Sequence, residues 1–377
     1  MHVAIVTETW PPEVNGVALT VQSLAHGLLA LGHSVELVRP RQSGDEPALQ
    51  QELPTLLLRG ASLPRYPGLR FGLPAQHRLY RHWARQHPDA LYIATEGPLG
   101  LTALGAARRL GIPVATGFHT RFDDFAQHYG LGALTPLVFS YLRRFHNRAD
   151  ATLVPTRELI ALLSTRGFHN VRLLRRAVDT KLFQPAQRDQ SLRACWGLAP
   201  GQLAVLHVGR LAPEKNLELV VRAFRAIQQR VDSARLIVVG DGPARASLAT
   251  ANPDFIFAGL RRGEDLARHY ASGDLFLFPS LTETFGNVTL EALASGVPVV
   301  AYDYGAAREH MSPASGRRVA FGDSDAFVAA AVAAATDSAP RELQREAARA
   351  ATSDLDPAAV SASFAQLLDE LCARRAA

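Results

Sequence analysis

The sequence of 377 residues is poor in cysteine and in lysine, and it has no long uninterrupted apolar run. Its two cysteines, Cys195 and Cys372, lie far apart and show no ligand-like spacing, which excludes a disulfide framework and a cysteine-based zinc site. No run approaches the roughly 20 apolar residues of a membrane span, and the opening stretch, MHVAIVTE, lacks the basic start and apolar centre of a signal peptide. We therefore expect the chain to be cytoplasmic.

The basic residues that are present lie mainly in the first half, where residues 1–180 hold 19 arginines and no lysine against 13 acidic residues. One stretch there interleaves arginines with aromatic residues, and its members are Arg65, Tyr66, Arg70, Phe71, Arg78, Tyr80, Arg81, Trp83 and Arg85. This pattern suits an anionic membrane surface or an acceptor located there, so we expect a peripheral position on the inner face of a membrane. RNA binding and a simple solvated face are the alternatives, and we expect no nucleic-acid partner.

Short β-rich runs alternate with stretches long enough for a helix, which predicts the α/β class with parallel sheets. The runs in the first half are HVAIVTE, SVELVRP, TLLLR, ALYIATE, PVATGF and ATLVPT, and those in the second half are LAVLHVG, RLIVVG, FIFAG, LFLFP, PVVAY and RRVAF. We expect two Rossmann-like, doubly wound domains that face each other across a cleft.

The predicted domains span residues 1–180 and 190–355, and a linker lies near residues 179–200, where turn residues are frequent and periodicity is weak. A last helix, about 357–377, is expected to pack back on the first domain.

Two glutamates eight positions apart, Glu283 and Glu291, bracket the turn of Phe285, Gly286 and Asn287 after the apolar strand LFLFP. A glycine there lets a ligand approach the backbone, and the following helix presents free amides and its positive end, which suits a phosphate. The carboxylates can accept hydrogen bonds from hydroxyl groups on either side of that anion. The alternative is that Glu283 only complements the helix dipole and Glu291 lies on the surface.

Lys215 is one of only two lysines, and it lies five positions after Arg210 beyond another predicted strand end. An ammonium and a guanidinium on one loop could clamp a diphosphate and neutralise the charge of a leaving group. A salt bridge from Lys215 to Glu214 or Glu218 is the alternative.

Two segments of the first domain also follow strand ends. Asn15 and Gly16 precede the first helix, where a plain tight turn would serve equally well, and His119 ends the fifth strand with an imidazole that could donate to a hydroxyl group. A histidine satisfied within the protein is the alternative for His119. The pair Asp123 and Asp124 is open between an acceptor contact, a base and solvated charge.

Two other patterns point away from a metal or a dinucleotide. The spacing of Asp323 and Asp325 matches that of many metal-dependent transferases, but a helix cap explains Asp323 or Ser324 more simply, and we expect no metal. Gly240 and Gly242 lack the third glycine of a dinucleotide fingerprint, so NAD is not expected and no cofactor is predicted.

With NGV, FHT, GRLAPEKN, GDGP and the glutamate pair in this order, nearly the whole chain resembles the family 4 retaining glycosyltransferases of GT-B fold. By that resemblance Glu291 holds the ribose of a nucleotide sugar, Glu283 contacts the sugar ring, Arg210 and Lys215 clamp the diphosphate, and His119 is the active-site histidine. The implied catalytic set is His119, Arg210, Lys215 and Glu283. The implied donor-binding set is Gly16, Gly209, Arg210, Lys215, Glu283, Phe285, Gly286, Asn287, Val288 and Glu291.

The stretches TETWPPEVNGVALTVQSL, FHTRFDDF and AYDYGAAREH resemble the subgroup of GDP-mannose-dependent mannosyltransferases and lipid-glycosylating relatives. The chain departs from the family pattern at Asn15, where many members have glycine, and at Ala177, which replaces a usual glycine. The resemblance implies metal-independent hexose transfer from a nucleoside-diphosphate sugar, with GDP-mannose as first candidate and UDP-glucose as second, to a lipid or glycan acceptor. A nucleotide-sugar epimerase, a glycoside hydrolase that uses Glu283 and Glu291, and a non-catalytic binding module are the alternatives.

Overall fold

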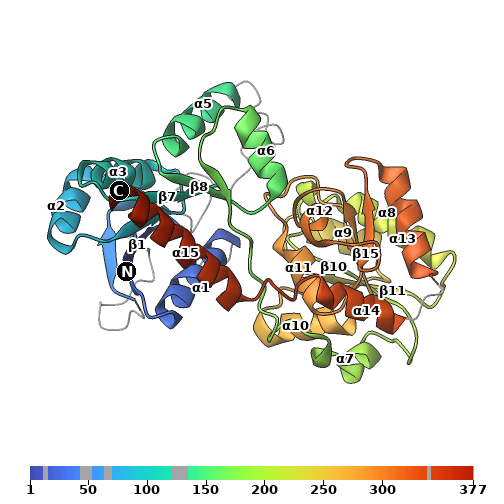
Figure 1. Cartoon of the computed structure of the whole chain (residues 1–377). Coiled ribbons are helices and arrows are strands. Elements are labelled where there is room, and N and C mark those ends of the chain that lie inside the picture. The colour runs from blue at the N-terminus through green and yellow to red at the C-terminus, as the bar shows by residue number, and fades with distance from the viewer. Residues whose placement is uncertain (12–15, 43–52, 63–69, 120–134, 338–340, 377) are drawn as a thin grey trace. The chain divides into compact units, whose positions relative to one another are not determined.

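The computed structural model describes residues 1–11, 16–42, 53–62, 70–119, 135–337 and 341–376. Contacts divide the chain into two compact units. Unit 1 comprises Met1–Ala177 and Pro357–Ala377, and unit 2 comprises Val178–Asp356. Figure 1 shows both units, and each is described by itself below.

Unit 1 is built on a parallel seven-stranded sheet with strand order β3-β2-β1-β6-β7-β8-β9. Its strands are β1 (His2–Val6), β2 (Ser34–Pro40), β3 (Thr55–Leu58), β6 (Ala90–Ile93), β7 (Val114–Gly117), β8 (Ala151–Val154) and β9 (Val171–Leu173). A short antiparallel ribbon joins β4 (Gly60–Ser62) to β5 (Arg70–Gly72). The six runs expected from the sequence all form strands, whereas β4, β5 and β9 are too short to show a pattern. The chain reverses its direction of winding between β1 and β6, which is where open α/β sheets bind ligands.

Six helices of unit 1 lie in the described ranges: α1 (Gly16–Ala30), α2 (Gln76–Gln86), α3 (Pro98–Arg109), α5 (Thr135–His146), α6 (Arg157–Thr165) and α15 (Pro357–Ala376). Helix α1 buries Val21, Leu24 and Leu28, and the chain leaves it at Gly32 with a φ of 82°. The last helix, α15, runs alongside α1 (Figure 1). The two helices approach closely at Gly27, because a Cβ atom there would lie 1.9 Å from Oγ of Ser361.

Unit 2 repeats the scheme with a parallel six-stranded sheet in the order β12-β11-β10-β13-β14-β15. Its strands are β10 (Ala204–Val208), β11 (Arg235–Val239), β12 (Ile256–Gly259), β13 (Leu275–Phe278), β14 (Val299–Tyr302) and β15 (Gly316–Val319). Its helices are η3 (Pro185–Gln187), α7 (Gln190–Cys195), η4 (Pro213–Lys215), α8 (Leu217–Gln228), α9 (Arg245–Ala251), α10 (Gly263–Ser272), α11 (Asn287–Ala294), α12 (Gly305–His310), α13 (Ser324–Ala335) and α14 (Arg341–Ala350). The winding reverses between β10 and β13, so the loops after these two strands lie at the ligand-binding edge.

The segment expected to be a linker, 179–200, is instead packed into unit 2. It contains η3 and α7, and Phe183, Trp196 and Leu198 are buried in the core of this unit. The segment is anchored by the buried carboxylate of Asp274, which accepts hydrogen bonds from Arg193 at 2.9 Å and from two further arginines, Arg188 and Arg345. These polar contacts are long range and leave no periodic trace in the sequence, so the prediction of a linker was wrong.

Two helix starts in unit 2 show how local chemistry sets the elements. Asp323 accepts a hydrogen bond from the amide of Ala326 at 2.9 Å and so caps α13, as the simpler reading of its motif predicts. Asn216 occupies the cap position of α8 but adopts a left-handed conformation with φ of 54°, and its side chain makes no capping hydrogen bond. None of the helices in the described part of the chain combines the length and apolar character needed to cross a bilayer.

Candidate active site

The loop after β10 carries the predicted cationic pair of unit 2. It packs backbone to backbone against the loop after β11, because a Cβ atom on Gly240 would lie 1.9 Å from the carbonyl oxygen of Gly209. The Arg210 side chain is 59% exposed, and its Nη1 lies 4.0 Å from Oε1 of Glu214. This exposed pair contributes little to stability, so Arg210 can turn toward a ligand at small cost.

Lys215 forms an ion pair with Glu283 rather than with either glutamate expected from its own segment. Both side chains are mostly buried, with exposed fractions of 16% and 17%. Oγ of Ser280 donates to the same Glu283 oxygen at 2.9 Å, and Nζ of Lys215 lies 5.6 Å from the centre of the Phe278 ring. The loops after β10 and β13 therefore meet through a desolvated ammonium and carboxylate.

The turn before α11 is shaped to leave the helix amides accessible. Phe285 is buried, and its carbonyl oxygen accepts a hydrogen bond from the amide of Ala306 at 2.7 Å. Gly286 then adopts a left-handed conformation with φ of 95°, which strains any other residue, and no side chain caps the helix that begins at Asn287. The uncapped amides of Asn287 and Val288 are the donors that an anion would use here.

Glu291 lies one turn inside α11 and accepts a hydrogen bond from the hydroxyl of Tyr270 at 2.9 Å. Burial raises the pKa of Glu291 to about 6, and the hydrogen bond from Tyr270 partly opposes this rise. Because Glu291 is partly buried and has a specific partner, its placement on an unconstrained surface is excluded. The Glu291 carboxylate can accept hydrogen bonds from hydroxyl groups, and it becomes a weaker acceptor when it is protonated near pH 6.

In unit 1, both ring nitrogens of His119 are held by the protein. Nε2 lies 2.8 Å from the Tyr92 hydroxyl, and Nδ1 lies 2.7 Å from Nη2 of Arg176. Burial, followed by the charge of Arg176, lowers the pKa of His119 well below its ordinary value. The imidazole is therefore neutral, Arg176 donates to Nδ1, and the proton on Nε2 is directed at Tyr92. Gly117 is required beside them, because its Cβ would lie 2.3 Å from Nε2.

Comparison with known proteins identifies the family of this chain. Residues 202–337 match the family model described as "Glycosyl transferases group 1", and residues 14–182 match "Glycosyltransferase Family 4". The chain is 37% identical over 340 residues to a "GDP-mannose-dependent alpha-mannosyltransferase" of Mycolicibacterium smegmatis, which covers 89% of this chain and 88% of the relative. The chain belongs to the family 4 glycosyltransferases.

Other relatives of this glycosyltransferase extend the comparison. It is 29% identical to the "Alpha-monoglucosyldiacylglycerol synthase" of Streptococcus pneumoniae, over 80% of this chain and 71% of the relative. Its fold is similar to that of sucrose-phosphate synthase from Thermosynechococcus elongatus, with a TM-score of 0.78 at 20% identity over 99% of both chains. It is also similar to Anabaena HepE in complex with UDP, with a TM-score of 0.76 at 19% identity over 98% of this chain and 100% of that one. These solved structures share its two Rossmann-like domains, which is the GT-B fold expected from the sequence.

Sequence reasoning missed two carboxylates of the glycosyltransferase, Glu8 and Glu96, which follow β1 and β6 at the switch point of unit 1. A Cβ atom on Gly97 would lie 2.3 Å from the Glu8 carboxylate oxygens, so only glycine fits before α3. Burial raises the pKa of Glu8 to about 7. Backbone hydrogen bonds partly oppose this rise, and the nearby charge of Glu96 adds to it. The signal was available, because the runs HVAIVTE and ALYIATE both end in Thr-Glu.

Other residues predicted to belong to the site do not take part in the contacts described above. Asn15, Arg65, Tyr66, Asp123 and Asp124 lie outside the described residues. Gly16 begins α1, Arg70 is half-buried, and Arg78 and Arg81 are exposed on α2.

Trp83 was predicted to contact the acceptor or a membrane, and this prediction was wrong. Its side chain is 0% exposed and its Nε1 donates to Oε2 of Glu36 at 3.2 Å. The helical spacing that brings Trp83 beside Leu79 turns both into the core.

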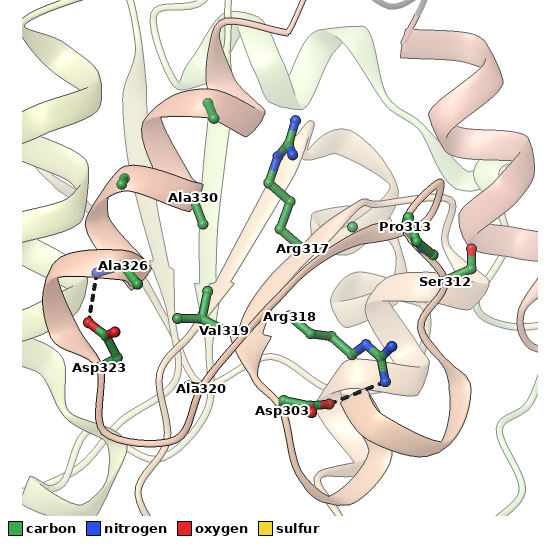
Figure 2. Close-up of a pocket in the computed structure, with 13 residues that line it drawn as sticks. Asp303, Ser312, Pro313, Arg317, Arg318, Val319, Ala320, Asp323, Ala326 and Ala330 are labelled. Carbon is green, nitrogen blue, oxygen red and sulfur yellow. Dashed lines mark hydrogen bonds and ion pairs between the residues drawn. The ribbon is translucent and has the colours of Figure 1, made fainter.

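A hollow of about 800 Å³ opens between β15 and α13 of unit 2 (Figure 2). None of the predicted site residues lines it. Its arginines are already paired, Arg317 with Asp337 and Arg318 with Asp303, each at 3.2 Å. Nowhere in the described ranges do three or more His, Cys, Asp or Glu side chains gather as they would around a metal ion.

Proposed function

We propose that this glycosyltransferase moves a hexose from a nucleoside-diphosphate sugar to a lipid or glycan acceptor, with retention at the anomeric carbon and without a metal. GDP-mannose is the first candidate donor, supported by the name of the Mycolicibacterium relative, and UDP-glucose is the second. A lipid acceptor is supported by the name of the Streptococcus relative.

The observation that carries the proposal is the ion pair of Lys215 with Glu283 beside the uncapped start of α11. A diphosphate that binds there would draw the ammonium of Lys215 from Glu283, and Arg210 would turn in to share the charge. Glu283, released from its cation, then accepts a hydrogen bond from a hydroxyl of the sugar. Lys215 and Glu283 thus hold each other in position until the donor binds, when the diphosphate replaces Glu283 as the partner of Lys215 and a sugar hydroxyl replaces Lys215 as the partner of Glu283.

The remaining residues take roles that follow from their charge states. Glu291 accepts hydrogen bonds from ribose hydroxyls, since Tyr270 fixes its carboxylate from the protein side. By family resemblance His119 contacts the sugar, and in its neutral form it can donate a hydrogen bond but not a proton. By family resemblance, the donor phosphate accepts the proton of the attacking hydroxyl. Catalysis then rests on preorganised charge around the departing diphosphate.

The exposed arginines of unit 1 support an acceptor at a membrane. Arg78 and Arg81 lie on the solvent side of α2, where they can reach anionic headgroups, and this exposure supports a peripheral position at the inner membrane face. Trp83 takes no part in this contact.

A panel of GDP, UDP and ADP tests the donor site. The cognate diphosphate at a hundred times its dissociation constant should stabilise the protein by about 2.7 kcal/mol. Transfer from GDP-mannose and UDP-glucose is then compared with and without EDTA, which should leave the rate unchanged. Stabilisation by none of the three diphosphates would overturn the proposed donor class.

The same assays separate the alternatives. Free sugar released from a glycoside without nucleotide would indicate a hydrolase, and donor isomerised without an acceptor would indicate an epimerase. Tight donor binding without turnover across many acceptors would indicate a binding module.

A further inference from the structure

A second hollow, of about 460 Å³, lies in unit 1 and is lined by four arginines, Arg41, Arg59, Arg70 and Arg78. The other described residues of its lining are apolar or glycine, and none of them is acidic. We call these four side chains the arginine pocket.

The fold brings the four arginines together from four separate segments of unit 1. Arg41 follows β2 and Arg59 follows β3, and these neighbouring parallel strands pair Pro40 with Leu58, so both arginines leave the same edge of the sheet. Arg70 comes from β5 of the antiparallel ribbon, and Arg78 from the first turn of α2. The pocket is therefore a product of tertiary structure, and its members span 38 positions of the sequence.

The positive charges of the arginine pocket are not compensated within the described part of the chain. Arg70 is half-buried and donates to the carbonyl oxygen of Gly60 at 2.8 Å, while Arg41, Arg59 and Arg78 are exposed and form no ion pair with another described residue. In the hollow of Figure 2, by contrast, Arg317 and Arg318 each have an aspartate partner. Like charges collected in a concave site raise the local concentration of anions.

The start of α2 adds an independent reason to expect an anion. No side chain caps this helix, and its first turn contains no acidic residue but does contain Arg78. A cation at that end opposes the helix dipole, and the free amides there also favour negative charge. An anion between Arg78 and the other arginines would satisfy both the guanidinium groups and the helix.

We propose that the arginine pocket binds the phosphate group of a ligand. Guanidinium groups match phosphate oxygens in a bidentate manner, and several of them converging favour an ion of more than one charge. The phosphate belongs either to a lipid headgroup or to a soluble phosphate ester. The pocket lies in unit 1 and uses none of the donor-binding residues of unit 2, so its binding does not rest on the proposed donor reaction. The further step, that this phosphate belongs to the acceptor, does rest on the proposed function.

Binding of inorganic phosphate and of glycerol 1-phosphate, measured by calorimetry, tests the pocket directly. The double variant Arg59→Gln/Arg78→Gln should weaken binding at least about tenfold, because two charge-assisted contacts are lost. The control Arg109→Gln/Arg144→Gln removes the same charge from exposed positions of unit 1 outside the pocket, and it should bind like the parent. Absence of phosphate binding in the parent, or equal weakening in the control, would overturn the proposal.

Vesicles distinguish the two sources of phosphate. Co-sedimentation is compared for phosphatidylcholine alone and for phosphatidylcholine mixed with phosphatidylglycerol, and glycerol 1-phosphate is added as competitor. Binding to the mixed vesicles that is lost in Arg59→Gln/Arg78→Gln assigns the pocket to a lipid headgroup. Binding of the soluble esters alone assigns it to a soluble phosphate. The thermal shift by GDP is followed on the same variants, so that failure of the pocket and failure of the donor site are read separately.

Discussion

Nη2 of Arg176 donates a hydrogen bond to Nδ1 of His119 over 2.7 Å, so a buried guanidinium contacts the predicted active-site histidine. Burial lowers the pKa of Arg176 to about 10, which leaves it charged at neutral pH. A cation at Nδ1 disfavours a second proton on the imidazole and assigns the ring proton to Nε2. Arg176 is thus a positioning residue that determines which nitrogen of His119 can donate.

Replacement of Arg176 by Met should raise the pKa of His119, because one of the causes that lower it is removed while burial remains. Isotope-edited NMR of the imidazole measures this directly. Arg175→Met removes the same charge at the neighbouring position and should leave the pKa unchanged. A His119 that titrates alike in the parent and in Arg176→Met would contradict the assigned role.

The same shift has a consequence for stability. Between its lowered pKa and about 6.5, folded His119 binds fewer protons than unfolded His119, so the free energy of unfolding falls as pH falls through this window. A higher pKa of His119 in Arg176→Met narrows the pH range over which folded and unfolded His119 differ in protonation. The acid-induced drop of the melting temperature attributable to His119, taken as the difference from His119→Gln in each background, should therefore be smaller in that variant.

Lys215→Ala should lower turnover roughly 10²-fold or more, which is the typical cost of one preorganised donor to a developing negative charge. Steady-state transfer from the donor identified by thermal shift measures this. The other lysine of the chain, Lys181, is exposed and outside the site, so Lys181→Ala is the matched control. Equal kinetics in both variants would remove Lys215 from the mechanism.

Donor binding should weaken as pH falls below about 6, because protonation of Glu291 removes an acceptor for ribose hydroxyls. Tyr270→Phe deletes the hydrogen bond that lowers this pKa, so the rise of the donor KM should begin at higher pH in that variant. KM against pH for parent and variant provides the test. Superimposable profiles would show that Glu291 does not hold the donor.

Asp274→Ala should destabilise unit 2 by about 3–5 kcal/mol, because three arginines lose a buried carboxylate partner. Denaturation followed by the fluorescence of Trp196, which is buried in this unit, reports the change. Asp325→Ala breaks an exposed pair with Arg222 and should cost no more than about 1 kcal/mol. Similar losses in the two variants would contradict the anchoring role of Asp274.

Much of the protein could be predicted from the sequence because the relevant signals are local. Strands buried on both faces must be apolar and helices between them must be amphipathic, so the alternation alone predicted twelve strands of two parallel sheets. The turn at Gly286 and the cap at Asp323 were also predictable, since each depends on residues within a few positions.

Tertiary structure decided which of the charged and aromatic residues act together. Trp83 is of a residue type that often anchors proteins at membranes, but its side chain is buried in the core. The segment 179–200 packs into unit 2, where Arg193 donates a hydrogen bond to Asp274. The pairing of Lys215 with Glu283, the support of His119 by Arg176 and the meeting of the four pocket arginines join residues that are distant along the chain. Ion pairs and hydrogen bonds of this kind depend on position and burial in three dimensions, and residue type specifies only which groups are available to form them.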